Sequence, residues 1–168
     1  MRIKITLQNG SPSDSRCRLE TRLLDAQGRT VGTLQTDETV GPNSTRDVSQ
    51  ETTLASPHLW SPDSPYLYRA RTEVMLTGHS VDICETRFGI RWFEFTADRG
   101  FFLNGAHLQL RGMCLHHDFG GLGVALPDRA NEKTVEIMKQ MGCNFLGSAH
   151  NEAAPALLEA CDRLGLLV

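Results

Sequence analysis

The sequence lacks the features of a membrane protein and of a nucleic-acid binder. It contains no run of roughly 18 consecutive apolar residues, the length that a transmembrane helix requires. Its 168 residues are 40% hydrophobic and 22% charged, a composition typical of a soluble globular protein. The formal net charge is only −3, and the basic residues are scattered instead of forming the positive face that binding to phosphates needs. We therefore expect no membrane partner and no nucleic-acid partner.

The sequence also lacks a cysteine pattern that would indicate a disulfide framework or a zinc knuckle. The number of cysteines is odd and none form a CxxC pair, so we expect reduced, buried thiols. No secretory signal is present either, because the first residues alternate apolar and polar side chains as in a strand. Such an abrupt start leads us to expect further chain before it, and the localisation stays open. The five cysteines are Cys17, Cys84, Cys114, Cys143 and Cys161.

What the first 92 residues do contain is the period-two alternation of an antiparallel β domain. Seven or so short strands in about 90 residues indicate an immunoglobulin-like β-sandwich over residues 1–92. Segment 57–65 contains three prolines and cannot join a sheet interior, since proline lacks the N–H donor. We expect an ordered crossing loop there. Trp60 could stack on a sugar, but the three prolines around it favour a structural role in a rigid loop. The predicted strands are 3–7, 17–24, 30–34, 46–53, 66–76 and 81–87.

After about Phe101 the pattern changes to strand, helix, strand, helix, strand. This order is that of the first part of a (β/α)8 barrel, which needs roughly 200 residues or more when complete. Residues 101–168 are therefore expected to be a truncated, N-terminal part of such a barrel. The predicted strands are 108–113, 143–146 and 166–168, and a glycine-rich loop is predicted at 116–126.

Both predicted helices have recognisable ends. Asp128 is expected to cap the first helix, because its carboxylate can accept the free amides of the first turn. Pro155 suits the first turn of the second helix, and Gly142 and Gly165 are expected to end the two helices. The side chains expected on the buried faces are Val135, Met138 and Met141 in the first helix and Leu157, Leu158, Cys161 and Leu164 in the second.

Several short motifs follow one another in a fixed order along the chain. They are Phe88-Gly89-Ile90-Arg91, Phe102-Leu103-Asn104-Gly105, Leu110 to Asp118 (LRGMCLHHD), Met138 to Asn144 (MKQMGCN), His150-Asn151, and Cys161 to Val168 (CDRLGLLV). In this order and at these intervals they resemble the junction and the first barrel strands of family 2 glycoside hydrolases of the β-galactosidase type. In the first half, Leu59-Trp60-Ser61-Pro62 followed by Pro65-Tyr66-Leu67-Tyr68 is similar to the sandwich that precedes the barrel in that family.

The resemblance implies retaining hydrolysis of β-galactosides or related β-glycosides through two carboxylates and a covalent glycosyl intermediate. In the family both glutamates lie on later barrel strands. We therefore expect an internal fragment that lacks both, that is inactive alone, and that needs no cofactor. The implied partner is the carbohydrate substrate of the intact parent. The alternative is a stand-alone β-sandwich module that binds carbohydrate or acts as a scaffold.

Four residues are candidates for sugar binding: His117, Asp118, His150 and Asn144. Barrel active sites are assembled at the carboxyl ends of the strands, where His117, Asp118 and His150 are predicted to lie. The resemblance implies that His150 contacts substrate hydroxyls, a task that suits a neutral imidazole able to donate and to accept. His116 and His117 are neighbours in an extended segment, so only one of them can face the pocket. Asn144 lies within the second strand, where such a residue is more often buried and hydrogen-bonded than a ligand.

Three positions near the second strand depart from the family pattern. Gly147 stands where the family has an arginine that supports the nucleophilic carboxylate, and glycine supplies neither charge nor a packed side chain. Ala149 replaces a usual serine, and Glu152 stands where a proline is common. A metal site is the alternative, because neighbouring strand ends carry competent ligands in Cys114, His116, His117, Asp118 and His150. Their spacing matches no zinc motif, and no metal site is assigned.

Overall fold

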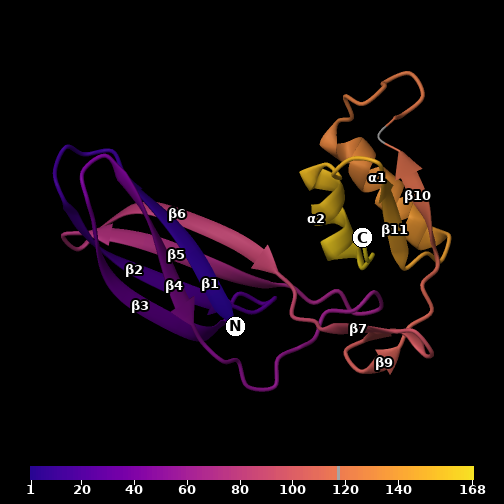
Figure 1. Ribbon diagram of the computed structural model, residues 1–168, viewed down its shortest axis with the longest axis horizontal. Coiled ribbons are helices and arrows are strands. Elements are labelled where there is room, and N and C mark those ends of the chain that lie inside the picture. Colours follow the sequence, from indigo (N-terminus) through magenta and orange to yellow (C-terminus); the bar gives the residue numbers. More distant parts are fainter. Residues whose placement is uncertain (117) are drawn as a thin grey trace. The chain divides into compact units, whose positions relative to one another are not determined.

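The computed structural model describes residues 1–116 and 118–168, which form two compact units (Figure 1). Unit 1 comprises Met1–Pro57 and Tyr68–Phe88, and unit 2 comprises His58–Leu67 and Gly89–Val168. The proline-rich segment 58–67 thus packs with the second half of the chain, although the sequence places it between two strands of the first half.

Unit 1, in which every residue is described, is a β-sandwich of six strands in two antiparallel sheets (Figure 1). The smaller sheet pairs β1 (Arg2–Asn9) with β4 (Ser44–Glu51). The larger sheet has the order β3-β2-β5-β6. Its strands are β2 (Ser15–Leu24), β3 (Thr30–Val40), β5 (Tyr68–Leu76) and β6 (His79–Phe88).

The core of unit 1 comes from the alternation that the sequence shows. In β2, Cys17 and Leu19 are buried while Arg18 between them is exposed, since successive side chains of a strand point to opposite faces. Leu7, Val40 and Val48 complete this apolar cluster from the neighbouring strands. The predicted sandwich is therefore confirmed, and most of its strands are longer than the ranges predicted from the sequence.

Unit 2 contains the predicted βαβαβ order. The strands β10 (Gly112–His116) and β11 (Phe145–Ala149) are parallel, and Leu167 extends the pairing by a parallel bridge to Phe145. The helices α1 (Asp128–Gln140) and α2 (Pro155–Leu164) follow the two strands. Before them lies a three-stranded antiparallel sheet that the sequence pattern did not reveal. It consists of β7 (Phe93–Thr96), β8 (Gly100–Leu103) and β9 (Ala106–His107).

The two helices pack with β11 around one apolar core. Its buried members are Val135, Met138, Leu146, Leu157, Ala160, Cys161 and Leu166. Two predicted core residues are wrong: Met141 is 61% exposed because it lies past the last turn of α1, and Leu158 is 41% exposed because its neighbour Leu157 takes the inward position. Among the described residues, no helix is long and apolar enough to cross a membrane.

The helix ends agree with the sequence in three of four cases. Pro155 occupies the first turn of α2, and Gly142 and Gly165 follow the helices with φ of +83° and +82°. The prediction for Asp128 is wrong, because the N-cap of α1 is Pro127 and makes no side-chain cap bond. Asp128 is instead the first helical residue, where its negative charge still favours the free amides of that turn.

The segment 58–67 is anchored in unit 2 by Trp60. This side chain is 1% exposed and packs with Phe101, Leu103 and Leu167. Its indole Nε1 donates a hydrogen bond to the carbonyl oxygen of Asp162 at 2.7 Å, and its backbone carbonyl accepts one from Asn104 at 3.0 Å. The expectation that Trp60 is a structural residue is thus confirmed.

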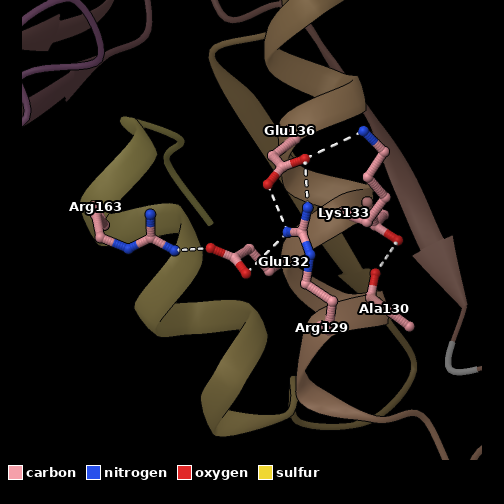
Figure 2. A network of polar contacts seen from close by, with 7 residues as sticks. Arg129, Ala130, Glu132, Lys133, Glu136 and Arg163 are labelled. Carbon is pink, nitrogen blue, oxygen red and sulfur yellow. Dashed lines mark hydrogen bonds and ion pairs between the residues drawn. The ribbon is translucent and has the colours of Figure 1, made fainter.

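A network of charged side chains joins the outer surfaces of α1 and α2 (Figure 2). Arg129 forms ion pairs with Glu132 at 2.9 Å and with Glu136 at 2.5 Å, and Lys133 reaches Glu136 at 3.2 Å. Figure 2 shows Arg163 projecting from α2 toward Glu132 of α1, with which it forms an ion pair. The hydrogen bonds from Arg129 and then from Lys133 lower the pKa of Glu136 from 4.5 to about 2.

Candidate functional site

The parallel register of β10 and β11 brings two histidines together at the carboxyl ends of the strands. Gly112 pairs with Phe145 and His116 with Ala149, so both strands end at the same edge. The rings of His116 and His150 lie there with centroids 5.1 Å apart and planes inclined by 62°. Both side chains are exposed. This edge is where a (β/α)8 barrel places its active site.

Strand alternation determines which way His116 faces. Leu115 packs against the helix-side core, so Cys114 and His116 on either side of it lie on the opposite face of β10. Gly147 of β11 agrees with this arrangement. It follows the buried Leu146 and so lies on the face away from the core, and a Cβ at Gly147 would lie 3.0 Å from the Cys114 sulfur. In a barrel the face away from the helices is the interior, so His116 lies on the face of β10 that corresponds to the barrel interior. The sequence singled out His117, which lies outside the described residues.

Asp118 opens the loop that follows β10. Asp118 is exposed and lies two residues after His116, the last residue of β10. The loop itself closes tightly, because the amide of Phe119 donates to the carbonyl of Gly123 at 3.0 Å and the amide of Gly123 donates back to Phe119 at 2.9 Å. Gly121 and Gly123 have positive φ, which glycine adopts without strain. The predicted turn is thus present and starts beside Asp118.

Asn144 has a different position from the other candidates. It is 7% exposed, its Oδ1 accepts a hydrogen bond from the Arg111 amide at 2.8 Å, and its Nδ2 donates to the Gln109 carbonyl at 2.9 Å. Six residues of extended chain, about 20 Å, separate it from His150. The structure therefore does not bring Asn144 to the edge where the histidines meet. It holds the chain entering β10 against the start of β11.

Two glycines set the spacing of the strand pair. At Gly112 a Cβ would lie 1.9 Å from the carbonyl oxygen of Phe145, so no side chain fits without separating the strands. At Gly147 a Cβ would press on the Cys114 sulfur, whose side chain would have to move. At Gly147, where the resemblance leads us to expect an arginine, the Cys114 sulfur thus occupies the space beside the backbone.

The cysteines are free, but they are not all buried. Cys17 and Cys161 are buried, whereas Cys84 and Cys114 are exposed, so the expectation of uniformly buried thiols is wrong. Burial raises the pKa of the Cys161 thiol to about 12. Cys84 is exposed because β6 forms the edge of its sheet, and Cys114 because it lies on the face of β10 away from the helices. Within the described residues, no group of three or more His, Cys, Asp and Glu side chains is arranged to hold a metal ion.

The structure is that of a two-part chain, a β-sandwich followed by the first βα units of a barrel. Residues 1–91 match the model for glycosyl hydrolases family 2, and residues 95–168 match the model for the TIM barrel domain of that family. The chain belongs to glycosyl hydrolases family 2.

Similar proteins include β-galactosidases and β-glucuronidases. β-Galactosidase BoGH2A of Bacteroides ovatus is 38% identical over 100% of this chain, which corresponds to 20% of that protein. The β-galactosidase of Thermoanaerobacter pseudethanolicus is 31% identical over 99% of this chain and 22% of its own length. The crystal structure of Bacteroides uniformis β-glucuronidase superimposes with a TM-score of 0.95 at 35% identity, over 99% of this chain and 20% of that one. The chain thus spans about a fifth of the length of these relatives.

Proposed function

We propose that this chain supplies the sandwich and the first sugar-binding strands of a retaining hydrolase for β-galactosides or related β-glycosides. His116 and His150, together with Asp118 at the start of the loop after β10, form its part of the sugar-binding rim. The chain does not contain the acid/base and the nucleophile, so it is inactive by itself. The meeting of His116 and His150 at one strand edge is the observation that carries this proposal.

The chemistry of the two histidines supports a role in sugar binding. A neutral imidazole has one donor and one acceptor nitrogen, which match a hydroxyl that both accepts and donates. Two such rings, exposed at neighbouring strand ends, can bind two hydroxyls of one sugar ring. His116 is included because it lies on the face of β10 away from the helices. His150 is included because the resemblance implies that it contacts the sugar and because its ring lies close to that of His116.

The absence of catalysis follows from what retaining hydrolysis requires. One carboxylate must attack the anomeric carbon while a second, roughly 5 to 5.5 Å away, protonates the leaving oxygen. The carboxylates beside the two histidines in the sequence are Asp118 and Glu152, and both are exposed. The resemblance places both catalytic glutamates on later barrel strands.

We further propose that residues 1–92 and 101–168 act as separate domains, with segment 58–67 belonging to the second. Limited trypsin digestion tests this division. A first cut between residues 92 and 101, where Arg99 is the trypsin site, should precede degradation within either domain, and segment 58–67 should stay protected with the second domain. Simultaneous degradation of both parts would contradict it.

A binding experiment with an activity control tests the proposed function. We expect methyl β-galactoside to shift NMR signals of the His116 and His150 side chains, and the shifts to disappear in His150→Ala. His79→Ala, a change in an exposed histidine of β6, should leave them unchanged. Aryl β-galactosides should not be hydrolysed above background. Turnover that disappears in Asp118→Ala or Glu152→Ala would overturn the claim of inactivity, and sugar-induced shifts confined to unit 1 would favour a sandwich binding module instead.

A further inference from the structure

The imidazoles of His116 and His150 are close enough to share one metal ion. Their ring centroids are 5.1 Å apart, and the planes are inclined by 62°. A zinc–nitrogen bond of about 2.0 to 2.1 Å places the centroids of two imidazoles on one ion on the order of 5 to 6 Å apart. Both side chains are exposed, so an ion can reach them.

We propose that His116 and His150 form a two-imidazole site for a divalent transition-metal ion of the Ni²⁺, Cu²⁺ and Zn²⁺ class. Imidazole nitrogen suits these ions, whereas Mg²⁺ and Ca²⁺ prefer oxygen ligands. His116 is the last residue of β10 and is paired with Ala149 of β11, and His150 is the residue that follows Ala149, so the strand pairing limits how far the two backbones can separate. The site is therefore largely formed before the ion arrives, which reduces the entropy lost on binding.

The site has two protein ligands, and water fills the other positions. No third His, Cys, Asp or Glu side chain within the described part of the chain joins the pair to make a three-ligand site. Cys114 lies on the same face of β10 as His116 but two residues earlier, about 6.6 Å along the strand. Binding is therefore weaker than at structural zinc sites, which use four protein ligands.

An ion at this position would inhibit sugar binding. It would occupy the imidazole nitrogens that otherwise contact hydroxyls, so metal and sugar would compete for the same two side chains. This consequence rests on the proposed function, whereas the metal site itself does not.

Calorimetric titration of the purified chain with NiCl2 tests the site. Ni²⁺ is the probe of choice because the five free cysteines would react with Cu²⁺ or bind Zn²⁺. We expect one Ni²⁺ per chain, no heat from MgCl2, and a loss of affinity of about tenfold or more in both His116→Ala and His150→Ala. Far-UV circular dichroism (CD) spectra should show that both variants remain folded.

Three further variants make the result decisive. His79→Ala, His107→Ala and Cys114→Ser should each retain the wild-type affinity for Ni²⁺. Undiminished affinity in His116→Ala or His150→Ala would overturn the proposal. So would an equal loss in any of these three variants, because the ligands would then lie elsewhere or outnumber the pair.

Competition separates this proposal from the proposed function. Saturating Ni²⁺ should abolish the heat of binding of methyl β-galactoside to the wild-type chain, measured by calorimetry because paramagnetic Ni²⁺ would itself broaden the NMR signals of both histidines. If Ni²⁺ binds and the sugar never does, the proposed function fails and the metal site stands. If the sugar binds equally with and without Ni²⁺, inhibition by the metal is overturned.

Discussion

The indole Nε1 of Trp60 donates a hydrogen bond to the carbonyl oxygen of Asp162, 102 residues later in the chain, at 2.7 Å. This bond ties the proline-rich segment 58–67 to α2, the helix that carries Asp162. Lys139 of α1 adds a second tie, since its Nζ donates to the carbonyl oxygens of Pro62 and Gly165, each at 3.0 Å. A segment encoded between two sandwich strands is therefore a structural part of unit 2.

Replacing Trp60 should destabilise unit 2 strongly. Trp60→Ala empties a buried, well-packed position, and we expect the free energy of unfolding to fall by about 3 to 5 kcal/mol. Trp60→Phe keeps most of the ring and loses the bond to Asp162, so a loss of about 1 to 2 kcal/mol is expected. Urea unfolding followed by the helical CD signal measures both. Trp92→Ala is the control, because Trp92 is 51% exposed, and a loss as large as that of Trp60→Ala would contradict the anchoring role.

Gly112 should not accept any side chain. In Gly112→Ala the new Cβ would lie 1.9 Å from the Phe145 carbonyl oxygen, so the two strands must separate. We expect a loss of about 3 kcal/mol or more, measured by thermal unfolding. Gly120→Ala serves as the matched control, since nothing lies within 4 Å of its Cβ position, and it should change stability by less than about 0.5 kcal/mol. Similar losses in both variants would show that Gly112 acts through backbone freedom and not through close approach.

Gly147 and Cys114 should be energetically coupled. Gly147→Arg introduces a Cβ 3.0 Å from the Cys114 sulfur, and we expect it to cost about 1 to 2 kcal/mol. Cys114→Ala removes the obstructing atom, so the double variant should recover much of that loss. A double-mutant cycle by urea unfolding measures the coupling, expected at about 1 kcal/mol. Strict additivity would mean that the cysteine does not obstruct the arginine.

The α1–α2 charge network should make the helices sensitive to acid. The pKa of Glu136 is about 2 in the folded chain, below its ordinary value of 4.5, because Arg129 and Lys133 hydrogen-bond the carboxylate. A lowered folded-state pKa gives stability that is fully present above pH 4.5 and is lost as the pH falls toward 2. Glu136→Gln should flatten this part of the pH profile of helical CD, and Glu159→Gln on α2 should not. High salt should weaken the difference, since the network is exposed.

Thiol labelling should separate the cysteines by their burial. Cys84 and Cys114 are exposed and should react first with iodoacetamide near neutral pH. Cys161 should stay unmodified until the chain unfolds, because burial raises its pKa to about 12 and the thiolate is the reactive form. Burial also raises the pKa of Cys17, which should react slowly. Peptide mass spectrometry identifies the modified positions, and early modification of Cys161 would contradict its place in the core.

The sequence by itself was sufficient for the features that depend on local chemistry. The alternation in β2 predicted its buried face, and Pro155, Gly142 and Gly165 predicted where helices begin and end. In each case the deciding interaction lies within a few residues of the one that signals it. The order of the motifs was likewise enough to recognise the family, which the matches to residues 1–91 and 95–168 support.

Only the tertiary structure decided which residues meet across long stretches of chain. His116 and His150 lie 34 positions apart and come together because β10 and β11 pair in parallel, and neither strand alone determines the register of that pairing. The same holds for Trp60, whose partner Asp162 is 102 residues away. The sequence placed the strand ends with His150 at one edge, because barrel strands run parallel, but it could not show that the His116 ring contacts the His150 ring, because that contact depends on the packing of the whole unit.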